Sequence, residues 1–301
     1  MPEDLERYSR QILFPPIGNE GQARLRGSRV AVVGCGALGS FSASMLARAG
    51  VGNLLILDRD FLEESNLQRQ ILFDQEDVRR LLPKAAAAAE HLRRINPAIQ
   101  VEGKVVDVTW RNIFAVAGEP DLIIDGTDNF ETRFLLNDFA VQREIPWIYG
   151  ACVGSYGISF TILPGRTPCL RCLIPSLPDA GSQQTCEQAG ILAPAAGMIA
   201  SLQVAEALKI LTGNPDRISE DLVTIDVWEN RHLRTRATRK EFPDGCRCCG
   251  EKRFPFLEGS EGTWDQSLCG RDSIQITPPI PGCLDLVRLE KVLRPAGRVE
   301  R

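Results

Sequence analysis

The chain has 301 residues, of which 44% are hydrophobic and 25% are charged, the balance of a folded protein rather than a disordered one. Its 35 basic and 39 acidic residues give a formal charge of −4, without the basic excess typical of nucleic-acid-binding proteins. The longest apolar run, 189–200, is too short to cross a bilayer, and the N-terminus lacks a secretory signal. We therefore expect a cytoplasmic protein that binds neither nucleic acid nor membrane.

Short apolar strands alternate with helices along most of the chain. The pattern predicts strands at 29–33, 53–57, 101–106, 121–125 and 145–149, and helices at 40–49, 83–95, 130–142 and 195–211. Residues 155–163 alternate differently and predict an antiparallel addition, and 222–227 predict a late strand. This order predicts an α/β fold of Rossmann type, a mostly parallel sheet with helices on both faces and antiparallel additions.

The composition changes after Cys249. Residues 258–263 are polar and rich in glycine, and a short strand at 273–277 and a helix at 284–293 are predicted beyond them. We expect one nucleotide-binding domain over residues 1–250. Residues 251–301 are expected to form a linker and a small C-terminal appendage that ends without a clear closing element.

A glycine-rich turn follows the first predicted strand. Gly34, Gly36 and Gly39 match the pattern G-x-G-x-x-G, and Asp58 ends the next strand, where a carboxylate can accept from ribose hydroxyls. The strand before the turn and the helix after it favour a nucleotide site at the helix N-terminus. The pattern does not say which nucleotide binds, and a nicotinamide-dependent dehydrogenase is an alternative.

Polar and cationic residues follow that aspartate. Asn66, Arg69 and Lys84 could bind the β- and γ-phosphates of a triphosphate, and Arg10 is a further candidate cation. A nicotinamide dinucleotide does not need such a group here. The alternative is a solvated surface run without function.

A second polar segment, residues 125–129, follows the fourth predicted strand. Asp128 could hold Mg²⁺, which prefers one or two carboxylates together with phosphate oxygens. The alternative is structural, because Asp128 or Asn129 could instead cap the next helix.

Two C-x-x-C pairs dominate the cysteine pattern. Cys169 with Cys172, and Cys246 with Cys249, predict a Cys₄ zinc site that joins distant parts of the fold. Cys248 is a competing fourth ligand, although Cys249 gives the more comfortable C-x-x-C spacing. A thioredoxin-like redox role is the alternative, but it does not explain two pairs.

Cys186 stands apart from both pairs. Its polar neighbours, Gln184, Glu187 and Gln188, predict an accessible thiol. Such a thiol is either a nucleophile or an incidental free cysteine.

Taken together, these motifs resemble a known family: the adenylyltransferases of the ubiquitin-activating superfamily that act on ubiquitin-like sulfur carriers in thiamine and molybdopterin biosynthesis. The resemblance covers about residues 5–250 and rests on Arg7–Gln11, Gly34–Gly39, Asp58, Ser65–Gln70, Lys84, Asp125–Asn129, the two C-x-x-C pairs and Thr185–Gly190.

The resemblance implies an activity and a set of partners. The enzyme would use ATP to adenylate the C-terminal glycine of a small carrier ending in Gly-Gly, giving an acyl-AMP and pyrophosphate. It would be a homodimer. Because residues 251–301 are too short for a sulfurtransferase domain, the sulfur would come from a separate donor protein. A non-catalytic carrier-binding scaffold is a further alternative.

The resemblance also implies residue roles. Asp128 would hold Mg²⁺, Asp58 would bind ribose, and Arg10 would reach the nucleotide across the dimer interface. Cys186 matches the position that bonds covalently to the carrier in some members, and the four paired cysteines would bind structural Zn²⁺. The nucleotide site would comprise Gly34, Gly36, Ala37, Gly39, Asp58, Ser65, Asn66, Leu67, Gln68, Arg69, Lys84, Asp128 and Asn129. Ala37 stands where the family often has glycine, which matters little if only its backbone N–H contacts the nucleotide.

Overall fold

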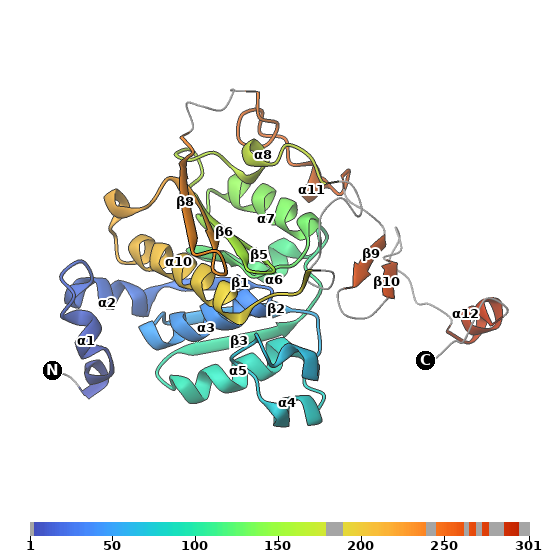
Figure 1. The fold of residues 1–301 in the computed structure, drawn as a ribbon, viewed down its shortest axis with the longest axis horizontal. Coiled ribbons are helices and arrows are strands. Elements are labelled where there is room, and N and C mark those ends of the chain that lie inside the picture. The colour runs from blue at the N-terminus through green and yellow to red at the C-terminus, as the bar shows by residue number, and fades with distance from the viewer. Residues whose placement is uncertain are drawn as a thin grey trace. The chain divides into compact units, whose positions relative to one another are not determined.

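The computed structural model describes residues 3–178, 189–238, 245–261, 265–268, 273–276 and 286–294 (Figure 1). The chain divides into two compact units, Met1–Gly262 and Thr263–Arg301. The first unit includes helix α11 (Pro255–Glu258), where Phe256 is buried with its ring 5.1 Å from that of Phe134. Residues 251–262 thus lie in the first unit, although the change of composition begins at Cys249.

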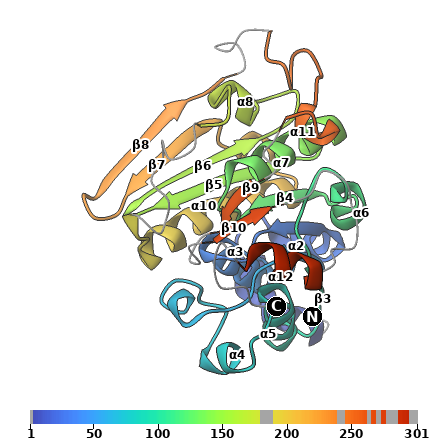
Figure 2. The ribbon, with the colours of Figure 1, turned by 90° about the vertical axis from the view of Figure 1, so that its right-hand side faces the viewer.

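An eight-stranded sheet forms the centre of the first unit, with the strand order β3-β2-β1-β4-β5-β6-β7-β8. The strands from β3 to β5 are parallel. Strands β6, β7 and β8 continue the sheet antiparallel (Figure 2). Their bounds are β1 Arg29–Val33, β2 Asn53–Asp58, β3 Gln100–Val105, β4 Leu122–Asp125, β5 Trp147–Val153, β6 Tyr156–Ile162, β7 Asp221–Asp226 and β8 Arg231–Arg236. The predicted fold class and antiparallel additions are confirmed, whereas β8 was not predicted.

Helices cover both faces of the sheet, because the parallel strands are apolar on both sides. Along β1, Val30 and Val32 pack toward α3 (Ala37–Ala49), α5 (Lys84–Ile95) and α10 (Ala193–Leu211). Ala31 and Val33 belong to the opposite core, with α6 (Ile113–Ala117) and α7 (Phe130–Arg143). The large core side chains on this second side include Phe134, which is fully buried.

The remaining elements are short. They are η1 Glu3–Tyr8, α1 Ser9–Ile12, α2 Gly18–Gly27, η2 Glu64–Asn66, α4 Gln75–Arg79, α8 Leu170–Leu173 and η3 Pro215–Arg217. In the second unit, β9 (Asp265–Leu268) pairs antiparallel with β10 (Ser273–Ile276), and α12 spans Leu286–Leu293.

Among the described residues, α10 is the one helix that is long and apolar enough to cross a membrane by length and composition. In this structure it packs against α3, β5 and β6 as a core helix. Its apolar character is therefore used inside the fold.

Candidate nucleotide and metal sites

In an open α/β sheet, a ligand crevice is expected outside the carboxyl ends of two neighbouring strands whose chain connections run to opposite sides of the sheet. In this sheet that position lies between β1 and β4. The chain runs from β1 to β2 and β3 on one side of it, and from β4 to β5 on the other side. Val33 pairs in register with Leu57 on one side and with Asp125 on the other. The register therefore places the glycine turn between Asp58 and the segment that carries Asp128.

The glycines of the turn are required by close backbone approach. Gly34 has φ +84°, and a Cβ added there would lie 2.5 Å from the carbonyl oxygen of Gly126. A Cβ on Gly39 would lie 1.9 Å from the carbonyl oxygen of Gly34. Gly126 has the same constraint, since its Cβ would lie 2.3 Å from that oxygen. Gly126 was not singled out from the sequence, because its role depends on contact between two loops.

The N-terminus of α3 opens onto this turn. Its N-cap is Gly36, which provides no side-chain hydrogen bond to the first turn of the helix. A Cβ on Gly36 would meet nothing closer than 3.9 Å, so the backbone is open to a ligand there. The first-turn N–H groups and the positive end of the helix dipole are suited to a phosphate.

Asp58 fastens the glycine turn to strand β2. Its Oδ2 accepts from the backbone N–H of Cys35 at 2.6 Å, and its Oδ1 accepts from that of Asp60 at 2.7 Å. Burial raises the pKa of this carboxyl, against the opposing charge of Lys84. A carboxylate keeps further lone pairs after two such bonds, so Asp58 can still accept from a ribose hydroxyl.

Lys84 begins α5, where it forms an ion pair with Asp60 and is affected by the charge of Asp58. Its Nζ lies 3.1 Å from Oδ2 of Asp60, and its side chain is only 10% exposed. Burial lowers the pKa of Lys84, but Asp58 and Asp60 outweigh that effect, so its pKa lies above the ordinary value and the ammonium stays charged. Asp60 was missed from the sequence, because nothing local shows that it faces Lys84.

The segment between β2 and α4 is structured rather than a solvated run. Asn66 is buried at the end of η2, and its Oδ1 accepts from the backbone N–H of Glu63 at 3.2 Å. Arg69 is half-buried and donates from Nη1 to the carbonyl of Ser65 at 2.7 Å. Gln68 is exposed and donates to the carbonyl of Ile191 at 3.5 Å.

Asp128 and Asn129 have different roles in the structure. Asn129 is the N-cap of α7, and its Oδ1 accepts from the backbone N–H of Thr132 at 2.8 Å. Asp128 is exposed and does not cap the helix. It is near enough to Lys84 to raise that residue's pKa. The carboxylate of Asp128 therefore does not serve as a helix cap, and its charge acts on Lys84.

Arg10 is exposed on α1, a helix that packs against η1 and α2. The two apolar residues that follow this helix are also exposed, Leu13 by 69% and Phe14 by 58%. The N-terminal segment thus presents a cation beside an apolar surface.

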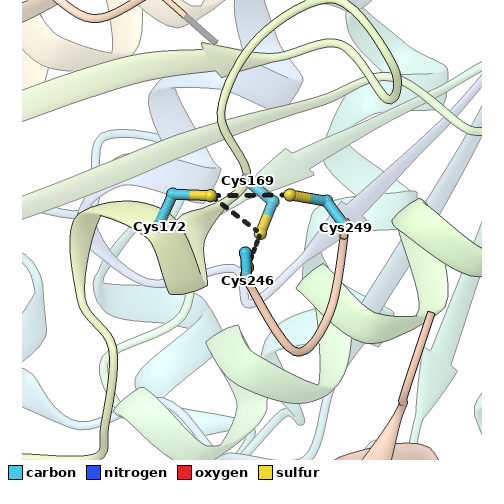
Figure 3. A group of neighbouring side chains, drawn as sticks. All are labelled: Cys169, Cys172, Cys246 and Cys249. Carbon is cyan, nitrogen blue, oxygen red and sulfur yellow. Dashed lines mark hydrogen bonds between the residues drawn. The ribbon is translucent and has the colours of Figure 1, made fainter. Parts of the chain in front are cut away.

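The four cysteines of the two C-x-x-C pairs come together, with their sulfur atoms pointing toward one another (Figure 3). The Sγ–Sγ distances are 3.9 Å for Cys169–Cys172, 3.7 Å for Cys169–Cys246 and 3.5 Å for Cys172–Cys249. Tetrahedral zinc with Zn–S bonds near 2.3 Å requires sulfur atoms about 3.8 Å apart. The cluster therefore fits a Cys₄ metal site.

Cys248 lies outside this group. It is fully buried, and its sulfur accepts from Nδ2 of Asn137 at 3.2 Å. The sequence left open whether Cys248 or Cys249 is the fourth member of the cluster. In the structure the fourth member is Cys249. Cys186 falls outside the described residues.

The comparisons with known proteins agree with this geometry. Residues 8–248 match the ThiF family. The chain belongs to the ThiF family. This ThiF-family protein is 49% identical over 291 residues to the "Sulfur carrier protein ThiS adenylyltransferase" of Bacillus subtilis (strain 168), covering 97% of this chain and 85% of that relative. It is 39% identical over 258 residues to the "SAMP-activating enzyme E1" of Haloferax volcanii, covering 84% of this chain and 92% of that relative.

A solved structure shows the same fold. The crystal structure of E. coli MccB with succinimide matches with a TM-score of 0.71 and 24% identity, covering 81% of this ThiF-family protein and 74% of that chain. At this identity the likeness concerns the fold alone.

Proposed function

We propose that this ThiF-family protein adenylates the C-terminal glycine of a ubiquitin-like sulfur carrier with ATP, in thiamine or molybdenum-cofactor biosynthesis. The observation that carries the proposal is that the open N-terminus of α3, Asp58 and Asp128 follow the carboxyl ends of the neighbouring strands β1, β2 and β4. Lys84 lies where the charges of Asp58 and Asp128 act on it. The names of its relatives, a ThiS adenylyltransferase and a SAMP-activating E1, support it.

The reaction joins two anions, so the site must neutralise charge and align the reactants. A carboxylate oxygen of the carrier's last glycine forms a bond to the α-phosphorus of ATP. The bond from that phosphorus to the β-phosphate oxygen breaks, and pyrophosphate leaves. No general base is needed, because the attacking carboxylate is already ionised.

The residues present fit the nucleotide. Lys84 and Arg69 would neutralise the departing phosphates, Asn66 would donate to them, and Asp58 would accept from the ribose. When bound, Mg²⁺ would screen the phosphate charge, and Asp128 would hold it. The remaining contacts are assigned to Gly34, Gly36, Ala37, Gly39, Ser65, Leu67, Gln68 and Asn129.

We also propose that the enzyme works as a homodimer in which Arg10 serves the partner's nucleotide. The exposed cation beside exposed Leu13 and Phe14 supports this, because such an apolar surface favours burial against another chain.

The cysteine cluster is proposed to hold structural zinc. The ligands belong to two chain segments, around α8 and at 246–249, so bound metal would stabilise the fold by joining them. The zinc would take no part in the adenylation chemistry.

Cys186 is proposed to act after adenylation. An acyl-AMP is a strong electrophile, and either the Cys186 thiolate or its persulfide, formed by a separate sulfur-donor protein, would attack the acyl carbon and displace AMP. Cys186→Ser should keep ATP–pyrophosphate exchange and lose sulfur transfer. Undiminished sulfur transfer by this variant would contradict the role.

The deciding experiment is ATP–pyrophosphate exchange with a Gly-Gly-ending carrier, compared with the same carrier lacking its last glycine. We expect exchange only with the intact carrier. Tight binding of NAD and no detectable binding of ATP by calorimetry would instead indicate a dehydrogenase. Carrier binding without any exchange would indicate a scaffold. We propose a cytoplasmic location, where ATP and the carrier are available.

A further inference from the structure

A buried ion pair lies directly beneath the segment that carries Asp128. Asp125, the last residue of β4, is fully buried, and its Oδ2 accepts from Nε of Arg133 at 3.2 Å. The Arg133 side chain comes from the first turns of α7 and is 7% exposed. Removing two charges from water is costly, so a pair in this place calls for a reason beyond stability.

The pair holds one residue of the loop, Thr127, at both its backbone N–H and its carbonyl. Oδ1 of Asp125 accepts from the backbone N–H of Thr127 at 2.9 Å and from its hydroxyl at 2.7 Å. Nη2 of Arg133 donates to the carbonyl of Thr127 at 2.7 Å and to that of Gly150 at 3.3 Å. Every polar group of Thr127 is thus engaged, and the next residue along the chain is Asp128.

The guanidinium is itself fixed by its surroundings. Its carbon lies 5.2 Å from the ring centre of Phe130 and 5.5 Å from that of Tyr149. Burial lowers the pKa of Arg133, but the carboxylates of Asp125 and Asp128 help to keep it above the ordinary value. The Arg133 guanidinium therefore stays charged and keeps one orientation.

We propose that Arg133 is a positioning residue that fixes the backbone of Asp128 in the orientation needed to hold the metal of Mg·ATP. The inference rests on the proposed function and deepens it. Asp128 is anchored on both sides, by the Thr127 peptide before it and by the helix cap of Asn129 after it. A lysine would supply charge at position 133, but its single ammonium group cannot donate in the planar fork that serves Asp125, Thr127 and Gly150 together.

The test compares the same substitution at two arginines of one helix. Arg133→Lys is the test variant. Arg143→Lys is the matched control. Arg143 lies in the last turn of α7, and its ion-pair and ring contacts among the described residues are a surface ion pair, 3.9 Å from Glu119, and a contact over the ring of Phe114. Mn²⁺ binding in the presence of a non-hydrolysable ATP analogue is measured by electron paramagnetic resonance, and analogue binding without metal is measured by calorimetry.

We expect Arg133→Lys to weaken Mn²⁺ binding by about tenfold or more, as misplacement of a site group does. Analogue binding without metal should stay within about twofold, and Arg143→Lys should match the wild type. In a double-mutant cycle, adding Arg133→Lys to Asp128→Ala should weaken Mn²⁺ binding no further, because Arg133 acts through Asp128. Additive losses, or wild-type Mn²⁺ binding by a folded Arg133→Lys protein, would overturn the inference.

A second variant covers the case in which Arg133→Lys fails to fold. Asp125→Asn with Arg133→Met removes both buried charges, keeps an acceptor for Thr127 and leaves no unpaired ion. The inference predicts the same loss of Mn²⁺ binding in this folded protein, and normal binding would refute it. Failure of the proposed function would give a different result, in which the wild-type enzyme itself binds no Mn²⁺ with the analogue and shows no exchange.

Discussion

Two neighbouring residues, Asp128 and Asn129, should respond to substitution in opposite ways. Asn129 caps α7 through a hydrogen bond of 2.8 Å to the backbone N–H of Thr132. Asp128 accepts only a long hydrogen bond, 3.4 Å, from Nδ2 of Asn129 among the contacts within the described chain. Removing the Asn129 side chain leaves a helix end without its cap, whereas removing the Asp128 side chain leaves the fold as it is.

The magnitudes follow from these contacts. Loss of a cap costs about 1 kcal/mol, so Asn129→Ala should lower the unfolding midpoint by about 2–4 °C. Asp128→Ala should change stability by less than about 0.5 kcal/mol, as expected for an exposed side chain with one weak contact. If Asp128 holds the metal at the phosphates, its loss should reduce exchange on the order of 10²-fold or more.

The assay pairs thermal unfolding with ATP–pyrophosphate exchange at saturating Mg²⁺ for both variants. We expect Asp128→Ala to be stable and inactive, and Asn129→Ala to be less stable and to keep clearly more exchange activity than Asp128→Ala. A loss of several degrees of stability in Asp128→Ala, with wild-type exchange, would refute the metal-holding role. That result would assign the helix cap, rather than the metal, to Asp128.

Three further predictions concern other parts of the molecule. Cys249→Ser should lose bound zinc and stability, while Cys248→Ser should keep about one zinc per chain by elemental analysis; equal loss would contradict the ligand assignment. Mixing Arg10→Ala with Asp128→Ala subunits should restore part of the exchange activity, because one site of the mixed dimer is intact; no recovery despite subunit exchange would mean that Arg10 acts within its own subunit. Burial raises the pKa of Asp138 from 3.8 to about 6. Between these two pKa values the native state holds a proton that the unfolded state releases, so the free energy of unfolding should fall as the pH rises from 3.8 to about 6. Asp138→Asn should remove that slope and be more stable than the wild type at pH 7 by up to about 3 kcal/mol in urea unfolding; parallel pH profiles would show that Asp138 does not titrate there.

The sequence by itself determined the main architecture, because the deciding signals are local. Apolar strands separated by amphipathic or alanine-rich helices predict a parallel sheet covered on both faces, and that is the observed arrangement from β1 to β5. Gly34 and Gly39 also carry a local signal, since Gly34 has a positive φ and a Cβ on Gly39 would meet the carbonyl oxygen of Gly34. The pairing of C-x-x-C motifs likewise predicted that Cys169, Cys172 and a cysteine of the second motif gather with Cys246.

Strand β8 shows where local reasoning ends. All six of its residues are exposed, and three of them are arginines, so no alternation of apolar and polar residues marks a strand. It forms because β7 offers a free edge and acids opposite: Arg234 lies 2.8 Å from Asp221, and Arg236 lies 2.8 Å from Glu220. That partner is supplied by the sheet and not by the segment's own sequence.

Where two adjacent residues were both candidates for one role, only the tertiary structure decided between them. Cys248 and Cys249 are adjacent, yet one faces Asn137 and the other faces the cysteine cluster. Asp128 and Asn129 are adjacent, yet only Asn129 turns back onto the helix. The physical reason is that such choices depend on the direction of a side chain relative to groups far away in the chain, and those directions exist only after the sheet and its helices have packed.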